Sequence, residues 1–383
     1  MRTMTQQQTA TGTVVDSATA PPMLTVGVEE EFLLLDPRSG RNVPVAEQVL
    51  AALPEELREF SRLEFRRSMV EMVSPVCTNL SDLHRQLSGL RRAAGDAAIG
   101  AGARLVAVGA TPVADEHLTV PDKPRYRAMA QQYGPIAGDP AVCGCHVHVG
   151  VPDRELAVQV CNHLRVWLPV IQAMGVNSPL HAGADTGHAS WRAMQLERWP
   201  SLGPTPYFES ADDYDRTVDA LITTGVMLDD TMVYWYARPS ATYPTVEVRV
   251  ADVGATVDDA VLIAGLIRAL VATVIDDIRA GLPAPQVRDC LVSAAHWQAA
   301  HNGLDGTLID LRLGGARPAW DLVDELFATA TPALLRHGDL HLVLAELTRL
   351  RRQGTGAARQ RVIHRRAGDV QAVLAYLARQ TAR

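Results

Sequence analysis

Three consecutive glutamates lie in the middle of an otherwise apolar segment, residues 25–36 (TVGVEEEFLLLD). Successive side chains of a strand point to opposite faces of its sheet, so Glu29 and Glu31 are predicted to share one face while Glu30 takes the other. Two carboxylates on one face of an apolar strand repel each other unless a cation lies between them, and a divalent metal would serve. The alternative is an edge strand whose acidic face meets water.

A second segment, residues 143–150 (CGCHVHVG), carries two histidines at strand spacing. His146 and His148 are predicted to share one face, where they can bind a metal or a phosphate, and the two cysteines point to the other. Histidines and cysteines therefore cannot share one zinc ion while the segment is extended. A pair of hydrogen-bonded structural histidines is the alternative interpretation.

Residues 63–75 (LEFRRSMVEMVSP) are predicted to form another strand, which ends at Pro75 because proline cannot donate to a strand ladder. Its alternation places Glu71, a further carboxylate, among apolar neighbours. Glu64 lies an odd number of residues from Glu71, so its side chain is predicted to point to the other face of the strand. It shares the face of Glu71 only if a bulge intervenes. Residues 245–252 (TVEVRVAD) form a strand that presents a glutamate and an arginine together, as either a buried ion pair or a metal ligand beside an anion clamp.

The polar residues on these predicted strands are expected to lie on one common face of the sheet, each among apolar neighbours. They are Glu29, Glu31, Glu71, His146, His148, Glu247 and Arg249. Several strands of one sheet with inward carboxylates and histidines imply a polar cavity that holds two or more hard cations. Arginine forks match phosphate oxygens, so the combination favours nucleotide-dependent phosphoryl chemistry over zinc hydrolysis.

The elements that must position these residues are strands early in the chain and helices later. Further strands are predicted at residues 105–109 and 232–239, and the polar stretches 111–140 and 177–200 are predicted to be functional loops. A Gly/Arg-rich loop is predicted at residues 354–361. Helices are predicted at residues 46–60, 79–100, 153–175, 211–224, 258–281, 286–301, 319–330, 337–352 and 367–381.

The net charge and the lysine content of the chain argue against two classes of binding site. The chain has 383 residues, 47% of them hydrophobic, and a formal charge of −7 that argues against a nucleic-acid partner. Its one lysine is Lys123, so a Walker-type phosphate site is excluded and a phosphate clamp must use arginine, metal or backbone amides. Residues 1–23 are predicted to be a disordered leader, and residues 24–383 a single catalytic domain.

Five cysteines without a signal peptide predict a reduced, cytoplasmic protein. The longest apolar run, residues 260–275, is interrupted by Arg268 and followed by two aspartates, so a buried helix fits better than a membrane span.

Seven short motifs add a resemblance. In chain order they are residues 27–32 (GVEEEF), 70–77 (VEMVSPVC), 144–152 (GCHVHVGVP), 177–179 (NSP), 185–187 (DTG), 238–239 (RP) and 244–252 (PTVEVRVAD). Each is weak alone, but the ordered set resembles the glutamate–cysteine ligase type 2 family, also called carboxylate–amine ligases, over nearly the whole chain.

The resemblance implies a glutamine synthetase-like α+β fold, in which a curved, mainly antiparallel sheet forms an active-site funnel with helices packed behind it. It also implies an enzyme that uses ATP and two or more Mg²⁺ ions, with Mn²⁺ as a substitute, to phosphorylate a carboxylate. That carboxylate is typically the γ-carboxylate of glutamate, and an amine then attacks to give an amide, ADP and phosphate. A homodimer is implied as well.

By motif position, the resemblance assigns roles to individual residues. It implies metal or phosphate contacts for Glu29, Glu31, Glu71, His146 and Glu247. It implies that Arg249 steadies the transferring phosphoryl group with His148 nearby. Nucleotide or substrate contacts are implied for Arg192, Arg238, Arg359, Asn177 and Asp185.

The chain departs from the family pattern at residues 297–303 (WQAAHNG), where an arginine is common, and at residues 354–360 (GTGAARQ). The acceptor amine is therefore open, with cysteine one candidate among others. Trp191, Trp199 and Trp235 are predicted to pack in the core, with a place in the substrate pocket as the alternative. Other functions that the same residues allow are a metal-dependent amidohydrolase, a guanidino kinase-like phosphotransferase, and a nucleotide-binding protein without turnover.

Overall fold

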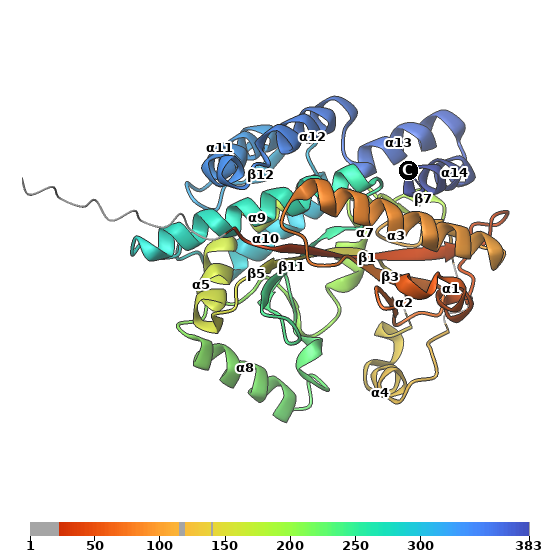
Figure 1. Ribbon diagram of the computed structural model, residues 1–383, viewed down its shortest axis with the longest axis horizontal. Coiled ribbons are helices and arrows are strands. Elements are labelled where there is room, and N and C mark those ends of the chain that lie inside the picture. The colour runs from red at the N-terminus through yellow and green to blue at the C-terminus, as the bar shows by residue number, and fades with distance from the viewer. Residues whose placement is uncertain (1–22, 115–118, 139–140, 383) are drawn as a thin grey trace, which may run out of the picture.

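A seven-stranded antiparallel sheet lies at the centre of the computed structural model, which describes residues 23–114, 119–138 and 141–382 (Figure 1). Six strands pair in the order β10–β11–β5–β1–β3–β2, and β4 pairs with the end of β1. Their bounds are β1 Val26–Leu35, β2 Ser61–Leu63, β3 Met69–Val73, β4 Arg104–Val106, β5 Gly144–Gly150, β10 Ala237–Pro239 and β11 Thr245–Asp252. The predicted disordered leader falls on residues outside the described range, apart from Met23.

One face of the sheet is apolar. In β1, β5 and β11 successive side chains alternate between the two faces, and the small or branched apolar side chains of all three strands point to this face. Val28, Val147 and Val248 are fully buried there in one core. Two long helices, α3 (Leu80–Gly100) and α9 (Val257–Arg279), run across this face (Figure 1). Helix α9 begins at a capping box in which Thr256 and Asp259 each bond the other's backbone N–H.

The remaining helices around the apolar face come from the middle and the C-terminal third of the chain. Helix α11 packs against α9, and Figure 1 shows α11 to α14 as an outer layer above α9 and α3. The bounds are α5 Arg154–Leu164, α6 Leu168–Met174, α10 Asp289–Asn302, α11 Ala319–His337, α12 Leu340–Gln353, α13 Gly356–Ala367 and α14 Val370–Thr381.

The opposite face of the sheet has less helical cover. Helices α4 (Pro124–Tyr133) and α8 (Ala211–Thr223) lie on that side in Figure 1. The smaller elements are α1 Ala46–Ala52, α2 Glu55–Arg58, α7 Trp191–Leu196, η1 Gly134–Ile136, η2 Asp230–Met232, β6 Leu180–His181, β7 Ala184–Asp185, β8 Leu202–Gly203, β9 Tyr234–Trp235, β12 Thr307–Ile309 and β13 Ala316–Pro318.

Several element predictions need correction, and helices α4 and α7 lie within the loops expected at 111–140 and 177–200. The helix expected at residues 46–60 is two short helices, because Pro54 interrupts it. The helix expected at 153–175 divides before Pro169, which occupies the first turn of α6. The loop expected at 354–361 is mostly helix α13, whose first turn is capped by the side chain of Thr355. The strand expected at 63–75 is a hairpin, since β2 and β3 pair with each other and Leu63 lies opposite Val70.

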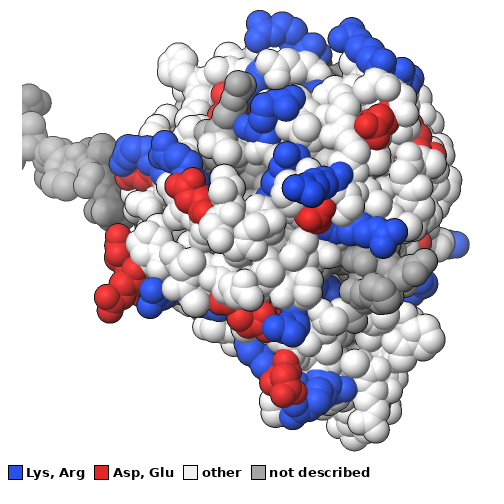
Figure 2. All heavy atoms as spheres, turned by 90° about the vertical axis from the view of Figure 1, so that its right-hand side faces the viewer, with Lys and Arg blue, Asp and Glu red and all other residues white. Residues whose placement is uncertain are grey.

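The fold class is confirmed as α+β with a mainly antiparallel sheet and helices packed behind it. Figure 2 shows the side of the molecule at the right of Figure 1, where basic and acidic side chains are interspersed over the described residues. No helix in the described part of the chain is both long enough and apolar enough to span a membrane. The single catalytic domain stays a prediction.

Candidate active site

The sheet face opposite α3 and α9 gathers carboxylates, histidines and arginines from five adjacent strands. The register sets four pairs directly opposite each other: Glu29 with His146, Glu31 with Glu71, Glu247 with His148, and Arg238 with Glu247. Because side chains of directly opposed residues point to the same face, these groups form one continuous polar strip across the sheet.

The glutamate triplet of β1 is divided between the two faces, as predicted. Glu30 is buried on the helical side, where both its oxygens accept hydrogen bonds from Arg91 of α3, at 2.9 and 2.5 Å. Glu29 lies on the other face, 3.4 Å from a ring nitrogen of each of His146 and His148. The division is thereby confirmed, and the metal-binding role of Glu29 and Glu31 stays a prediction.

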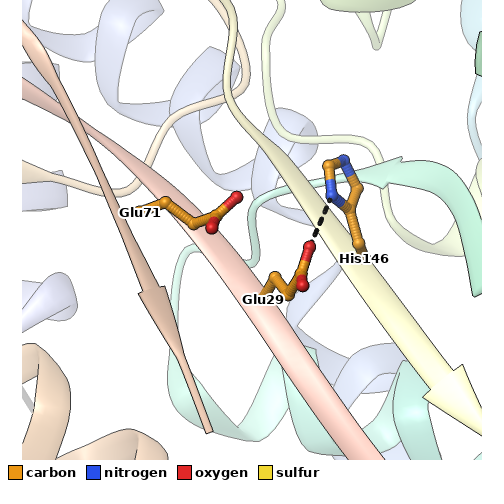
Figure 3. A group of neighbouring side chains, drawn as sticks. All are labelled: Glu29, Glu71 and His146. Carbon is orange, nitrogen blue, oxygen red and sulfur yellow. Dashed lines mark hydrogen bonds and ion pairs between the residues drawn. The ribbon is translucent and has the colours of Figure 1, made fainter. Parts of the chain in front are cut away.

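Three groups of side chains on this face are compact enough to hold a metal ion, because their candidate ligand atoms lie within 4.8 Å of one another. The groups are Glu29, Glu71 and His146; Glu29, His148 and Glu247; and Glu31, Glu64 and Glu71. Figure 3 shows the first group, whose three side chains come from neighbouring strands and point into the same space. The donor set suits hard divalent cations, which prefer carboxylate oxygens.

His146 also shows that the site is built for a further ligand. Its Nδ1 lies 3.4 Å from Glu29, but its buried Nε2 has no hydrogen-bond partner among the described residues. Burial and the nearby Arg249 guanidinium lower the pKa of His146, so the ring is neutral at pH 7 and keeps a lone pair. A neutral imidazole is the form that binds a metal. The residues present therefore fit divalent metal ions.

Two carboxyl groups of the third group are hard to ionise while no cation is present. Burial and the charge of Glu31 raise the pKa of Glu64 to about 7. Burial and the charge of Glu64 raise the pKa of Glu71 well above its ordinary value. Both shifts show that negative charge is crowded at this point of the sheet, and a bound cation would relieve the crowding.

Two other carboxylates on the face are held ionised. Burial opposes ionisation of Glu29, but hydrogen bonds with His146 and His148 outweigh it and lower the pKa of Glu29. Burial likewise opposes ionisation of Glu247, but the charges of Arg249 and Arg238 hold its pKa well below the ordinary value. The face thus combines permanently charged carboxylates with ones that take up protons.

The raised pKa of Glu64 predicts a pH-dependent stability difference between the wild type and Glu64→Gln. Between the unfolded pKa near 4.5 and the folded pKa of about 7, the folded wild type binds more protons than the unfolded chain, so its free energy of unfolding falls as pH rises. Glutamine mimics the protonated acid. In EDTA the variant is expected to match the wild type near pH 4.5 and to exceed it by roughly 2–3 kcal/mol at pH 8.

Chemical denaturation at both pH values measures this difference. Adding Mg²⁺ at pH 8 should remove much of it, because the cation neutralises the carboxylates of the wild type. A difference that is the same at both pH values would contradict the assignment. The exposed Glu56, changed to glutamine, is the control and should show no such pH dependence.

Arginines complete the charged face. Arg249 lies where a bulge interrupts the pairing of β11 with β5, and its guanidinium forms an ion pair with Glu247 and lies 3.4 Å from His146 Nδ1. Arg238 also donates to Glu247, at 2.9 Å. Glu247 is thus held between two guanidinium groups. The guanidinium of Arg249 lies beside the carboxylates, where it can also bind an anion.

Arg192 reaches the same space from α7. Its position is set by Asp252 at the end of β11, whose carboxylate accepts hydrogen bonds from the hydroxyl groups of Ser178 and Ser190, at 2.7 and 2.8 Å. Ser190 in turn caps α7. Arg192 is buried 3.9 Å from Asp252, and its Nε has no hydrogen-bond partner among the described residues.

Three predicted contact residues lie away from this face. The side-chain amide of Asn177 donates to the backbone carbonyls of Ala107 and Val253, a structural arrangement. Arg359 forms an ion pair with Asp259 at the start of α9, and Asp185 pairs with Arg361 at 3.0 Å. The structure does not bring these three residues to the carboxylates, so their predicted contacts with nucleotide or substrate rest on the motif alone.

The sequence-based site missed two features. Glu64 was expected on this face only if a bulge intervened, but it reaches the face because it follows β2 in the turn of the β2–β3 hairpin. The second feature is a cavity of about 170 Å³ beside Glu31, Glu64 and Arg249. Trp199 lines this cavity, whereas Trp235 packs in a core with Phe208 and Tyr214.

The chain is similar to a known protein family over most of its length. The family described as glutamate–cysteine ligase family 2 matches residues 25–375. A relative from Salinispora tropica, named "Putative glutamate--cysteine ligase 2", is 67% identical over 368 residues, which cover 95% of this chain and 97% of the relative. One from Mycolicibacterium vanbaalenii, named "Putative glutamate--cysteine ligase 2-2", is 48% identical over 357 residues, 93% of this chain and 98% of the relative.

Two solved structures share the fold at low sequence identity. A bifunctional glutathione synthetase from Pasteurella multocida superposes with a TM-score of 0.70 at 15% identity, over 94% of this chain and 52% of that one. The chain thus spans about half the length of that enzyme. A glutamate–cysteine ligase from Francisella tularensis, solved with AMP, has a TM-score of 0.66 at 12% identity, over 94% of this chain and 89% of that one.

Proposed function

This chain belongs to glutamate–cysteine ligase family 2, and from that membership we propose that it is an ATP- and Mg²⁺-dependent carboxylate–amine ligase. Its carboxylate substrate is proposed to be the γ-carboxylate of glutamate, and its second substrate cysteine or another amine. The observation that carries the proposal is one sheet face on which three carboxylate-rich groups lie beside a half-buried arginine, Arg249.

The proposed reaction has two steps. A carboxylate oxygen attacks the terminal phosphorus of ATP, the bond to the bridging oxygen breaks, and an acyl phosphate and ADP form. The amine nitrogen then attacks the acyl carbon, inorganic phosphate leaves with the bonding electrons, and the nitrogen loses a proton. Both steps bring anionic or electron-rich groups together, so positioning and charge neutralisation dominate the barrier.

The residues of the sheet face supply that neutralisation. Glu29, Glu71, Glu247, His146 and His148, with Glu31 and Glu64, would hold the magnesium ions. Held there, such ions would supply positive charge to offset the negative charge that develops on the phosphate oxygens.

Arg249 is the residue placed to hold the transferring phosphoryl group. Its guanidinium is fixed by the ion pair with Glu247 and by the Tyr234 ring, 5.8 Å away, so little entropy is lost when it binds an anion. Arg192 is placed to hold a substrate carboxylate, since it is buried, charged and incompletely hydrogen-bonded. Arg238 keeps Glu247 ionised and oriented.

A phosphate-release assay tests the proposal. Phosphate should appear from ATP only when Mg²⁺, glutamate and an accepted amine are all present, and mass spectrometry should detect the amide. Phosphate transfer to one substrate alone would indicate a kinase, and cleavage of an amide without ATP an amidohydrolase. Tight ATP binding with no product across a broad amine panel would indicate a nucleotide-binding protein without turnover.

Gly144 offers a further prediction, because a side chain there has no room. A Cβ atom at this position would lie 2.4 Å from Arg192 Nη2 and 3.0 Å from His146 Nε2. Gly144→Ala is therefore expected to displace both groups and to lower kcat/KM by about 10²-fold. Circular dichroism should show an unchanged fold, since alanine suits an extended backbone. Gly89→Ala, which meets no atom within 4 Å, is the matched control.

The proposal extends to the location and the assembly of the protein. We infer a cytoplasmic enzyme, because the five cysteines are all free thiols and four of them are buried. A homodimer is proposed from the family resemblance, and light scattering of the purified protein measures it directly.

A further inference from the structure

We propose that the acceptor substrate is an amine with a ring-sized apolar group, which binds in the cavity beside the carboxylates. This inference rests on the proposed ligase function and names the class of its second substrate. The observations that carry it are the volume of the cavity, the aromatic side chains along its wall, and the charged groups among its lining residues.

The cavity has the right size for a ring. Its volume of about 170 Å³ is close to the roughly 150 Å³ of an apolar cavity that accepts benzene in another protein. The CH₂–SH group of cysteine would leave most of that space unfilled, and the walls of an unfilled apolar space lose their contacts. A small polar amine therefore gains less from this cavity than an amine that carries a ring.

Part of the cavity wall is aromatic and apolar, and the rest carries polar side chains such as Arg66, Gln172 and Arg192. Three rings form a contiguous row, in which Phe65 lies 6.1 Å from Trp199 and Trp199 lies 5.9 Å from Tyr234, both with edge-to-face geometry. Met129 and Leu196 add aliphatic surface. Edge-to-face arrangements are those that aromatic groups prefer, so a further ring can join this row favourably.

The cavity also meets the reaction face, because Glu31, Glu64 and Arg249 are among its lining residues. The space that a ring would enter is therefore continuous with the groups proposed to hold magnesium and, at Arg249 over the Tyr234 ring at 5.8 Å, the phosphoryl group. An amine whose nitrogen lies beside Glu31 and Glu64 would direct its apolar group toward Phe65 and Trp199. This orientation places the nucleophile next to the activated carboxylate.

The other two substrates fit the aromatic part of the cavity wall less well. Glutamate has no apolar group for it. Adenine has ring nitrogens that require hydrogen-bond partners once buried, and Phe65, Met129 and Leu196 offer none, whereas Gln172 and Arg192 elsewhere in the lining can bind polar groups. The apolar group of an amine is therefore what the aromatic part of the wall favours.

The test compares amines that differ only by a ring. With ATP, Mg²⁺ and glutamate fixed, kcat/KM is measured for phenylethylamine, ethylamine and cysteine. We expect phenylethylamine to exceed both others by about 10²-fold, the scale on which an apolar pocket separates substrates that differ in buried apolar groups. Ethylamine or cysteine equal to or better than phenylethylamine would overturn the inference and leave the ligase function standing.

Substitutions of cavity-lining residues test whether the cavity causes the preference for phenylethylamine. Trp199→Ala is expected to reduce the phenylethylamine preference at least 10-fold. Leu196→Phe, which fills part of the cavity, should lower kcat/KM for phenylethylamine more than for ethylamine. Trp297→Ala, an exposed tryptophan outside the cavity, is the control and should change neither.

Two further outcomes would overturn the inference. The first is a KM for ATP that rises in Trp199→Ala while the amine preference stays unchanged, which would assign the cavity to the nucleobase. The second is a preference for ring-bearing carboxylates paired with small amines, which would assign the cavity to the other substrate. Absence of phosphate release with every amine and carboxylate would instead refute the ligase function itself.

Discussion

Glu29→Gln is expected to lower the kcat/KM of ATP-dependent amide formation by about 10³-fold while the fold stays intact. Glu29 belongs to two of the three candidate metal groups and lies 3.4 Å from a nitrogen of each active-site histidine. Glutamine preserves the size of the side chain but removes its charge. The amide can neither balance a divalent cation nor accept the hydrogen bonds of both histidines.

The measurement is a rate titrated with Mg²⁺, together with a thermal melt. The rate of the variant should remain low at high Mg²⁺, and its melting temperature should stay near that of the wild type. Glu56→Gln, on the exposed surface, is the matched control and should keep full activity. A folded Glu29→Gln protein with undiminished magnesium-dependent activity would refute the role assigned to Glu29.

The site could be predicted from the sequence where strand alternation alone decides which way a side chain points. In β1 and β5 the apolar residues identify the buried face, so the polar residues between them must share the other. The register of β1 against β5 and β3 then brings Glu29 to His146 and Glu31 to Glu71. That register depends on pairing between distant segments, which local alternation does not encode, so the sequence predicted a shared face but not which residues meet on it.

The features that could not be predicted depend on turns and on contacts between distant segments. The hairpin between β2 and β3 is not visible in the alternation of residues 63–75, so Glu64 was expected on the polar face only on the condition of a bulge. The cavity needs Phe65 from one segment and Trp199 from another to meet, and no local periodicity encodes that meeting. The role of Asn177 was obscured for a similar reason, because its partners Ala107 and Val253 are remote in the chain.

Glu30→Gln is expected to have the opposite effect to Glu29→Gln, with a loss of about 3–5 kcal/mol in the free energy of unfolding and little change in activity per folded molecule. Glu30 and Arg91 are each 1% exposed and form a bidentate ion pair beneath the sheet. The variant leaves a buried guanidinium without a counter-charge. Its remaining partner in this arrangement is the carbonyl of Gly254, at 2.9 Å.

Urea denaturation measures this loss, and a double variant separates its causes. Glu30→Leu combined with Arg91→Met removes both charges, so it should be more stable than either single variant, since no uncompensated charge remains. Equal destabilisation in the double variant would show that packing around Phe32, whose ring lies 5.3 Å from the Arg91 guanidinium, is the larger contribution. Because Glu29 and Glu30 are adjacent on one strand, an activity loss confined to Glu29 and a stability loss confined to Glu30 can arise only from the opposite faces that their side chains occupy.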